Sequence, residues 1–251
     1  MKISLAQMNL AWEDPAANLE TMHDLIDRNG CGDVLVLPEL WATGFSMNTE
    51  CHQLVEGLEV FLSKAARDYG IWLIAGIPEW DDDQGGQENR LVLFDCSGNR
   101  VGHYAKQKLF TYAKEHHSYA SGSRNDTVWN LEGLRVAPSI CYELRFPELA
   151  RQRARQVDLI LYAANWPAPR IAHWDVLLPA RALENQAYAI GVNRVGEDGN
   201  GWQFCGHSAC FDPMGERTLF AGSDEGIFHV DVHSETVKQV RENLPFLADM
   251  T

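Results

Sequence analysis

The stretch RVAPSICYELRFPELARQRARQVDLILYAA, residues 135–164, decides the fold. It begins with a run of small and apolar residues, RVAPSIC, which is typical of a buried strand. A helix is predicted from about Phe146 to Gln156, because Pro147 is tolerated in the first turn of a helix. The apolar run DLILYAA then predicts a second buried strand. The stretch is therefore interpreted as a strand–helix–strand unit, the element from which α/β proteins are built.

A second unit of the same kind lies near the N-terminus, where ISLAQM (3–8) and DVLVLP (33–38) flank a predicted helix from about Pro15 to Arg28. NRLVLFD and RVGHYA, separated by CSGN, predict a hairpin, so the sheets are mixed rather than wholly parallel. The likeness of the two units suggests two related half-sheets that face each other. Further strands are predicted in IWLIAGIP (71–78), AYAIGVNRV (187–195), FCGHSACFD (204–212) and GIFHVDV (226–232), and further helices over about 55–69, 173–186 and 234–241.

Composition narrows the class of protein. A length of 251 residues, 45% of them apolar, suits a single large α/β sandwich. The formal charge of -14 disfavours a nucleic-acid partner, and no basic run favours a membrane surface. No apolar run approaches the roughly 18 residues that span a bilayer. QEN (87–89), preceded by DDDQGG, predicts a charged hairpin tip or loop on the solvated surface.

The N-terminal residues and the cysteines indicate a cytoplasmic protein. MKISLAQMNLAWED lacks the pattern of a signal peptide, since Gln7 and Asn9 interrupt its apolar run. The six cysteines include no CxxC pair, which argues against a zinc site and against a disulfide framework. A reducing compartment would leave their thiols free for chemistry.

One of these cysteines, Cys141, ends the first strand of the opening stretch. A tight strand-to-helix connection places its thiol at the end of a sheet, where α/β proteins build their sites. Backbone N–H groups just after it could bind an oxyanion. The alternative is a buried structural cysteine, which is commoner among cysteines in general.

A nucleophilic cysteine needs a base or a cation nearby, because a thiol with a pKa of about 8.5 is mostly protonated at neutral pH. No histidine lies in a Cys–His protease context. Glu39 ends the strand DVLVLPEL, and Lys106 and Lys108 follow the strand in GHYAKQKLF. Partial burial would raise the pKa of such a carboxyl group toward the range useful for proton transfer. Taken singly, these residues are better explained by a helix cap for Glu39 and by solvent-facing lysines.

Taken together, LPEL, YAKQKLF and SICYELRFPEL resemble the Glu, Lys and Cys signatures of the nitrilase superfamily of carbon–nitrogen hydrolases. SLAQMNL, NWP, HW, ARALEN, GVNRVG and DPMGE also look like this family, so the resemblance runs from residue 3 to the tail. It implies a four-layer α-β-β-α sandwich of two mixed sheets flanked by helices. It also implies an enzyme that needs no metal or organic cofactor.

The resemblance assigns roles to individual residues. Glu39 would be the general base, Lys106 would stabilise the oxyanion together with the Tyr142 backbone N–H, and Cys141 would be the nucleophile that forms a thioester. Glu115, the only acidic residue in FTYAKEHHSYASG, matches a second glutamate that the family often uses. Lys108 departs from the pattern, since many relatives carry histidine there.

Substrate-binding candidates follow from the same comparison. Arg145 could bind a substrate carboxylate, since guanidinium geometry suits bidentate binding. A structural ion pair with Glu148 is an equal alternative. Tyr142 and Trp166 are candidate pocket walls, although aromatic residues at sheet ends are more often simple packing. Tyr112 and Phe45 are weaker candidates of the same kind.

Within the superfamily the chain looks most similar to bacterial ω-amidases, through YELRFPEL and the run over residues 165–196. This implies hydrolysis of 2-oxoglutaramate or 2-oxosuccinamate to the 2-oxo acid and ammonia. An amidase for deaminated glutathione and an N-carbamoyl hydrolase are alternatives. A catalytically silent binding protein or a redox sensor at Cys141 is the non-enzymatic alternative.

The resemblance also implies at least a homodimer. The tail from about residue 238 to residue 251 is predicted to lie at the interface, because its apolar residues Leu244, Phe246 and Leu247 would be unsupported in a monomer.

Overall fold

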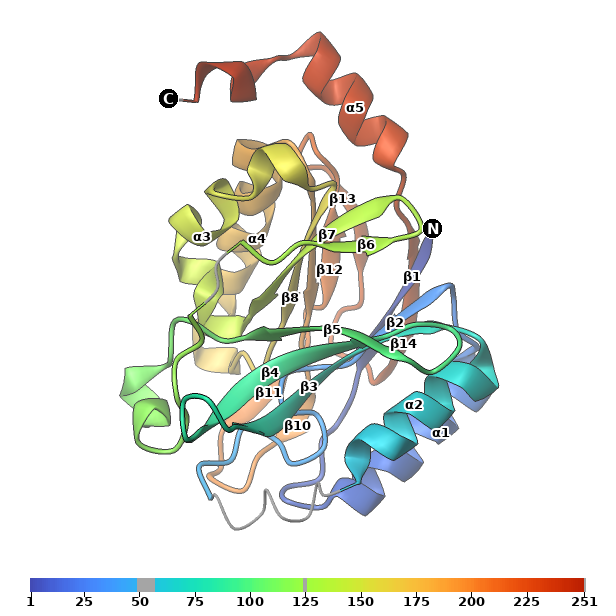
Figure 1. Cartoon of the computed structure of the whole chain (residues 1–251), viewed down its shortest axis with the longest axis vertical. Coiled ribbons are helices and arrows are strands. Elements are labelled where there is room, and N and C mark those ends of the chain that lie inside the picture. Colours follow the sequence, from blue (N-terminus) through green and yellow to red (C-terminus); the bar gives the residue numbers. More distant parts are fainter. Residues whose placement is uncertain (49–56, 124–125, 251) are drawn as a thin grey trace.

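The computed structural model describes residues 1–48, 57–123 and 126–250, and shows two six-stranded sheets packed face to face (Figure 1). The first sheet has the order β14-β1-β2-β3-β4-β5, and the second has the order β13-β12-β9-β8-β7-β6. The first sheet consists of β1 (Lys2–Gln7), β2 (Val34–Val36), β3 (Trp72–Asp81), β4 (Gly86–Phe94), β5 (Arg100–Ala105) and β14 (Gly226–Asp231). The second consists of β6 (Trp129–Leu131), β7 (Leu134–Ile140), β8 (Leu159–Ala163), β9 (Tyr188–Val192), β12 (Ala209–Phe211) and β13 (Arg217–Phe220).

Helices form the outer layers. α1 (Pro15–Asn29) and α2 (Leu58–Tyr69) cover the first sheet, whereas α3 (Pro147–Arg151) and α4 (Ile171–Asn185) cover the second (Figure 1). A two-stranded ribbon, β10 (Val195–Glu197) with β11 (Gln203–Cys205), stands apart from both sheets. α5 (Ser234–Asn243) leads into the C-terminal tail. The predicted α-β-β-α sandwich is confirmed.

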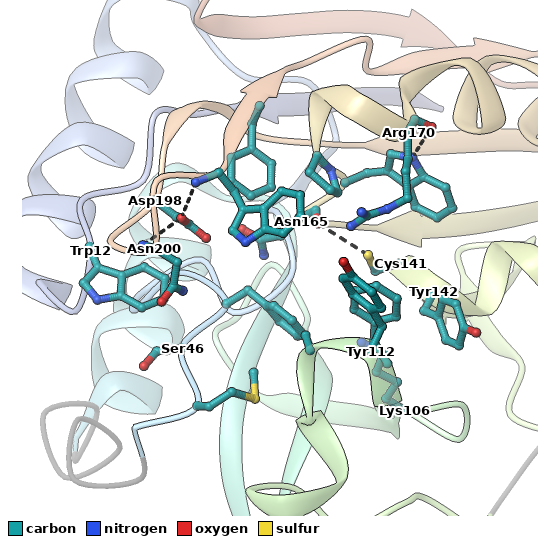
Figure 2. Close-up of a pocket in the computed structure, with 18 of the residues that line it drawn as sticks. Trp12, Ser46, Lys106, Tyr112, Cys141, Tyr142, Asn165, Arg170, Asp198 and Asn200 are labelled. Atoms are coloured by element: carbon teal, nitrogen blue, oxygen red, sulfur yellow. Dashed lines mark hydrogen bonds between the residues drawn. The ribbon is translucent and has the colours of Figure 1, made fainter.

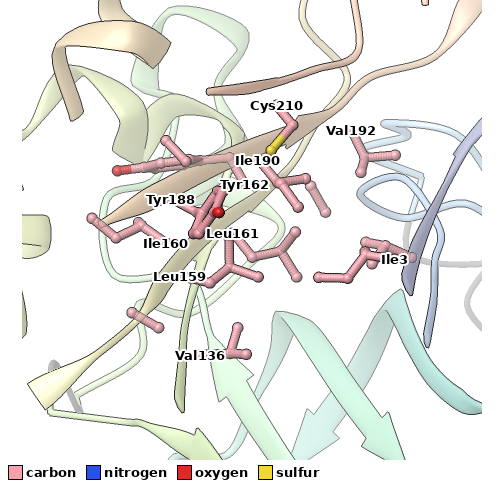
Figure 3. Close-up of a cluster of buried hydrophobic side chains, with 14 of the residues drawn as sticks. Ile3, Val136, Leu159, Ile160, Leu161, Tyr162, Tyr188, Ile190, Val192 and Cys210 are labelled. Carbon is pink, nitrogen blue, oxygen red and sulfur yellow. The ribbon is translucent and has the colours of Figure 1, made fainter. Parts of the chain in front are cut away.

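The main core lies between the sheets. Ile3, Val34 and Leu91 of the first sheet pack in one cluster with Val136, Leu159 and Ile190 of the second, and Figure 3 shows part of this cluster. A second cluster fills the space between the first sheet and its helices, where Met22 and Leu62 are almost fully buried. Burying one such side chain stabilises the fold by about 1.5–3 kcal/mol. The first cluster therefore holds the two sheets together, and the second holds the helices on the first sheet.

Both predicted strand–helix–strand units are present. β1 and β2 are parallel neighbours across α1, and β7 and β8 are parallel neighbours across α3. α1 begins where the Asp14 carboxylate accepts a hydrogen bond from the Ala17 N–H, and it ends at Gly30, which has a positive φ. These local signals explain why its bounds were predictable to within about one residue.

Several predicted elements differ from the structure. The helix predicted over 146–156 is the short α3 followed by a separate 3-10 turn, Ala154–Gln156. The interruption coincides with Arg153, whose guanidinium turns inward to donate to the Pro138 carbonyl at 2.7 Å. The strand predicted over 204–212 is divided between β11 and β12 because Gly206 and His207 both have positive φ. Residues 55 and 56 of the predicted second helix lie outside the described residues.

The prediction that residues 87–89 form a solvated hairpin tip is wrong. These residues belong to β4, and Glu88 and Asn89 are buried. β3 and β4 pair over nine residue pairs, from Leu73–Phe94 to Asp81–Gly86, so the turn lies entirely before Gly86. Arg90 makes ion pairs with Glu79, Asp81 and Glu88, which compensates for burying charge in this part of the hairpin.

The tail is partly supported by its own chain. Leu247 is buried, contrary to the expectation that it would be unsupported, because the Arg155 guanidinium donates to its carbonyl at 2.8 Å and holds the tail down. Phe246 is 61% exposed.

Gly76 in β3 lies directly against the turn that carries Glu39. A Cβ added there would lie 2.6 Å from the Leu40 amide nitrogen and 2.7 Å from both the Glu39 Cα and the Pro38 carbonyl oxygen. These are backbone atoms, which cannot rotate away as a side chain can. Glycine at this position therefore allows the Glu39 turn to approach the sheet.

We expect Gly76→Ala to lower the free energy of unfolding by about 1–3 kcal/mol, because the turn must shift to admit the methyl group. Urea denaturation measures this. Gly226→Ala in β14 is the matched control: its added Cβ would lie 3.5 Å from the Phe228 ring, an ordinary contact. The control should change stability by less than about 1 kcal/mol. Equal losses in both variants would contradict the expectation.

Candidate active site

Cys141 lies on a strained connection directly after β7. Its φ of 44° is in the left-handed region, which non-glycine residues rarely adopt, and it begins the 3-10 helix Cys141–Arg145. The thiol donates to the Asn165 carbonyl oxygen, with a sulfur–oxygen distance of 3.7 Å. Figure 2 shows the sulfur facing the cavity that this site borders. The prediction of a cysteine on a tight strand-to-helix connection is confirmed.

Glu143 holds this connection against the loop that follows β5. One of its carboxylate oxygens accepts hydrogen bonds from the Tyr104 hydroxyl and the Gln107 N–H, both at 2.8 Å. The other accepts from the Ile140 N–H at 2.7 Å. Burial raises the pKa of Glu143, while these donors act in the opposite direction. The carboxylate thus links the residue before Cys141 to the residue after Lys106.

The centre of the site is a fully buried cluster of one ammonium and two carboxyl groups. Lys106 Nζ lies 2.7 Å from Glu39 Oε1 and 2.9 Å from Glu115 Oε1, and all three side chains are 0% exposed. The Asn89 side-chain N–H group donates to the same two oxygens, at 2.8 and 3.0 Å. The structure therefore brings together the three charged residues predicted from the sequence, and adds an amide that contacts both acids.

Glu39 connects this cluster to the second sheet. Its remaining carboxylate oxygen accepts from the Asn165 backbone N–H at 3.0 Å, and its carbonyl accepts from the Asn165 side chain at 2.6 Å. Since the Cys141 thiol contacts the Asn165 carbonyl, Asn165 fixes the acid and the thiol relative to each other. The alternative of a helix cap for Glu39 does not hold, because its side chain is engaged here.

The electrostatics of the cluster favour a protonated lysine and a protonated thiol. Burial alone would lower the pKa of Lys106, but the charges of Glu115 and Glu39 outweigh it and raise that pKa above its ordinary value. Burial, together with the Glu39 charge and a hydrogen bond to Glu39, raises the pKa of Cys141, and the Lys106 charge only partly opposes this. The thiol is therefore neutral at rest, beside a carboxyl group that can accept its proton.

A cavity of about 500 Å³ opens from the thiol toward solvent (Figure 2). Tyr142, Arg145 and Trp166, the predicted substrate-binding residues, all line it, as do the weaker candidates Phe45 and Tyr112. A volume of this size is in the range of sites for small molecules.

The structure shows what surrounds Arg145 and Lys108, the two positions left open by the sequence. Arg145 makes no ion pair with Glu148 or any other acid among the described residues; its guanidinium lies over the Trp166 ring, 4.7 Å from the centroid. Lys108 lies over the Phe146 ring at 5.3 Å and does not line the cavity. The lysine found here in place of the family's histidine therefore packs on Phe146 and is not part of the cavity wall.

Sequence reasoning missed four residues of this site. Asn89 was assigned to a surface loop, and Glu143, Asn165 and Arg170 were not singled out although they lie in quoted motifs. Asn165 directly follows the buried run that ends DLILYAA, and a polar residue at the end of a strand is a signal that could have identified it.

Within the described ranges the protein has no candidate metal site, no membrane-spanning helix and no disulfide. No group of three or more His, Cys, Asp or Glu side chains there could hold a metal ion. No helix in those ranges is long and apolar enough to cross a bilayer. The five described cysteines are free thiols, and Cys51 lies outside the described residues.

Comparison with known proteins relates this geometry to chemistry. A family model described as carbon-nitrogen hydrolase matches residues 2–242. The chain is 38% identical to an omega-amidase YafV of Yersinia enterocolitica over 99% of its own length and 96% of that protein. It is 31% identical to a 2-oxoglutaramate amidase of Bacillus subtilis with the same coverage of both chains.

Solved structures of related proteins have the same fold. A CN-hydrolase superfamily protein of Xanthomonas campestris, with an arsenic adduct in its active site, superposes with a TM-score of 0.91 at 30% identity, covering 100% of this chain and 97% of that one. A mutant of an amidase from Nesterenkonia, which shows Michael addition of acrylamide at its active-site cysteine, has a TM-score of 0.84 at 26% identity, covering 98% of both chains.

We expect Glu39→Gln to lower the pKa of the Cys141 thiol. The carboxylate destabilises the thiolate through its charge, so a neutral amide should let the thiolate form at lower pH. Iodoacetamide alkylation against pH, quantified on the Cys141 peptide by mass spectrometry, measures the midpoint. Cys205, a half-buried thiol outside the cluster, is an internal control whose midpoint should not move. An unchanged or higher midpoint at Cys141 would refute the electrostatic role of Glu39.

Proposed function

The chain belongs to the carbon–nitrogen hydrolase family and is a hydrolase of linear amides, and we propose that it is a cytoplasmic ω-amidase acting on 2-oxoglutaramate. The observation that carries this proposal is the buried Lys106–Glu39–Glu115 cluster beside the Cys141 thiol at the base of a small-molecule cavity. This arrangement supplies a nucleophile, a proton acceptor and a fixed positive charge without recruiting a histidine.

In the first half of the reaction, Cys141 attacks the amide carbon while Glu39 removes the thiol proton. The oxyanion of the tetrahedral intermediate is stabilised by Lys106 and by the Tyr142 backbone N–H. Glu39 then donates the proton to the leaving nitrogen, the C–N bond breaks, and ammonia departs. A thioester between Cys141 and the acyl group remains.

In the second half, water attacks the thioester carbon and Glu39 removes a proton from it. The carbon–sulfur bond breaks as the intermediate collapses, the Cys141 sulfur is reprotonated, and the carboxylic acid is released. Glu115 holds Lys106 through its first carboxylate oxygen and the Phe110 N–H through its second, at 2.5 Å. Glu115 thus supports both the ammonium and the cavity wall.

Substrate identity is supported by two lines of argument. Relatives with 31–38% identity are named omega-amidase or 2-oxoglutaramate amidase and are covered almost fully. In the cavity, Arg145 has no acidic partner among the described residues. Its neighbours are the His173 ring nitrogen at 3.1 Å and the Trp166 ring, so its charge is available to a substrate carboxylate. Tyr142 and Trp166 form walls on either side of that guanidinium.

The size of the cavity favours one second candidate. At about 500 Å³ it has room for more than a five-carbon amide, so an amidase of deaminated glutathione fits the same machinery. An N-carbamoyl hydrolase would use the same residues, but no feature of the cavity favours a carbamoyl substrate. A silent binding protein or a redox sensor would not require the Glu39–Lys106–Glu115 cluster to be intact, as it is here.

Ammonia release tests the proposal. We expect wild-type protein to turn over 2-oxoglutaramate faster than deaminated glutathione or an N-carbamoyl amino acid. Cys141→Ala should abolish the activity because the nucleophile is lost, and Glu39→Gln should lower kcat/KM by about 10²–10⁴-fold. Cys96→Ala, which removes an exposed thiol on the β4–β5 turn, is the matched control and should match wild type. Wild-type rates in Cys141→Ala would exclude the mechanism.

We further propose that the protein is a homodimer formed through the outer face of α4 and the C-terminal tail. Val176 and Leu183 on α4 are 68% and 52% exposed, and Phe246 in the tail is 61% exposed. Apolar side chains of this size are commonly covered at an interface between subunits.

Light scattering after size exclusion should give twice the 28.2 kDa of one chain. Leu183→Glu should shift the species toward the monomer, since it would place a charge in the apolar interface. Phe61→Glu is the control, because Phe61 is 51% exposed but lies on α2, on the opposite outer layer. A monomeric wild type, or equal dissociation in both variants, would argue against this interface.

A further inference from the structure

The cavity contains a second arginine that the mechanism does not use. Arg170 ends the 3-10 turn Ala168–Arg170 immediately before α4 and lines the same cavity as Cys141. In Figure 2 its side chain extends toward the space in front of the sulfur. Nothing in the proposed reaction requires a cation here, since Lys106 already faces the reacting carbon.

The surroundings of Arg170 are aromatic rather than acidic. Its guanidinium lies over three rings from two segments: Phe110 at 5.3 Å, Tyr112 at 5.9 Å and Trp202 at 5.2 Å. Among the described residues it has no ion-pair partner within 4.0 Å. Ring faces compensate a buried cation only partly, by about 0.5–2 kcal/mol each. The guanidinium therefore retains N–H donors and charge for a ligand.

The acids of the cavity are already engaged elsewhere. Glu13 accepts hydrogen bonds from Ser46 at 2.5 Å and Asn48 at 3.1 Å. Asp198 accepts from the backbone N–H groups of Asn200 and Trp202, both at 2.9 Å. Neither acid forms an ion pair with Arg170. No acid that lines the cavity therefore neutralises Arg170, and its charge is available to an external anion.

The backbone of Arg170 is fixed relative to Arg145 through Trp166. The Trp166 indole N–H donates to the Arg170 carbonyl at 2.8 Å, and the ring of Trp166 supports the Arg145 guanidinium at 4.7 Å. Both arginines line the same cavity. Burial lowers the pKa of Arg170, and the Arg145 charge acts in the same direction. Trp166 thus positions the Arg145 guanidinium with its ring and the Arg170 backbone with its indole N–H, and two guanidinium groups that line one cavity can bind a single anionic group.

We propose that Arg170 binds the carboxylate of the substrate together with Arg145, and that it selects ω-amides carrying a carboxylate over neutral amides of the same length. This inference rests on the proposed amidase function of the site. The substrate amide would then lie at Cys141 and its carboxylate at the two arginines.

Matched substrates test this selectivity. Glutaramate and valeramide have the same five-carbon chain and the same amide, and differ only in a carboxylate or a methyl group at the far end. We expect Arg170→Met to lower the ratio of kcat/KM for glutaramate to kcat/KM for valeramide by about 10–100-fold, since one charge-assisted interaction is removed. The loss should appear in KM for glutaramate. Arg170→Lys should recover part of the ratio, because it retains the charge without the bidentate geometry.

Two controls make the result interpretable. Arg217→Met removes the same type of charge from an exposed position on β13 and should leave the ratio unchanged. Thermal denaturation of each variant checks that Arg170→Met remains folded. An unchanged ratio in folded Arg170→Met, with both amides affected equally, would overturn the proposal and assign Arg170 to the shape of the wall.

A binding measurement separates this inference from the proposed function. Calorimetry with glutarate, which needs no turnover, should show about 10–100-fold weaker binding to Arg170→Met than to wild type. If wild type hydrolyses neither amide, the amidase proposal fails, yet weaker glutarate binding would still support the arginine site. Equal glutarate affinity in the two proteins would overturn the arginine site even if amidase activity is present.

Discussion

The whole site depends on one buried ammonium shared by two carboxyl groups. Lys106 is 0% exposed, and so are Glu39 and Glu115, so none of the three charges is stabilised by water. Removing one partner of a buried ion pair typically costs about 3–5 kcal/mol, because the remaining charge is left uncompensated. Asn89 adds donors to the same two carboxylate oxygens and fixes the distance between them. Each buried charge in the cluster is compensated only when its partners are in place. The positions of these side chains are therefore fixed more tightly than those of exposed charges.

The cluster also explains why two facing sheets are needed. Glu39 follows β2, Lys106 follows β5, and Asn89 lies in β4, so these residues come from the first sheet; Cys141 follows β7 and Asn165 follows β8, in the second. Hydrogen bonds from Asn165 to Glu39, and from Gln107 to Glu143, cross from one sheet to the other. The thiol and its proton acceptor therefore lie on different layers, and their separation is set by the core between the sheets rather than by a local turn.

Because the site is assembled from two sheets, local sequence patterns predict its elements better than they predict its side-chain contacts. The strand–helix–strand units follow from local periodicity and caps, and three motifs were enough to predict that Glu39, Lys106 and Cys141 belong to one site. Asn89 was misassigned because QEN has the composition of a surface loop, whereas its side chain is satisfied inside the protein by Glu39 and Glu115, which lie far from it in the sequence. Arg170 lies in a short segment with two prolines that suggests a surface loop, and only the tertiary structure brings three aromatic rings around it.

The resting state of the thiol constrains the order of events in the proposed mechanism. Burial and the Glu39 charge raise the pKa of Cys141, so a free thiolate does not accumulate before substrate arrives. In the proposed mechanism, proton transfer to Glu39 therefore accompanies attack on a carbonyl carbon already positioned beside the sulfur. As the proton moves to Glu39, the acid loses its charge and no longer competes for the Lys106 ammonium. That ammonium is then more available to the developing oxyanion, so a single proton transfer both activates the nucleophile and strengthens the stabilisation of the transition state.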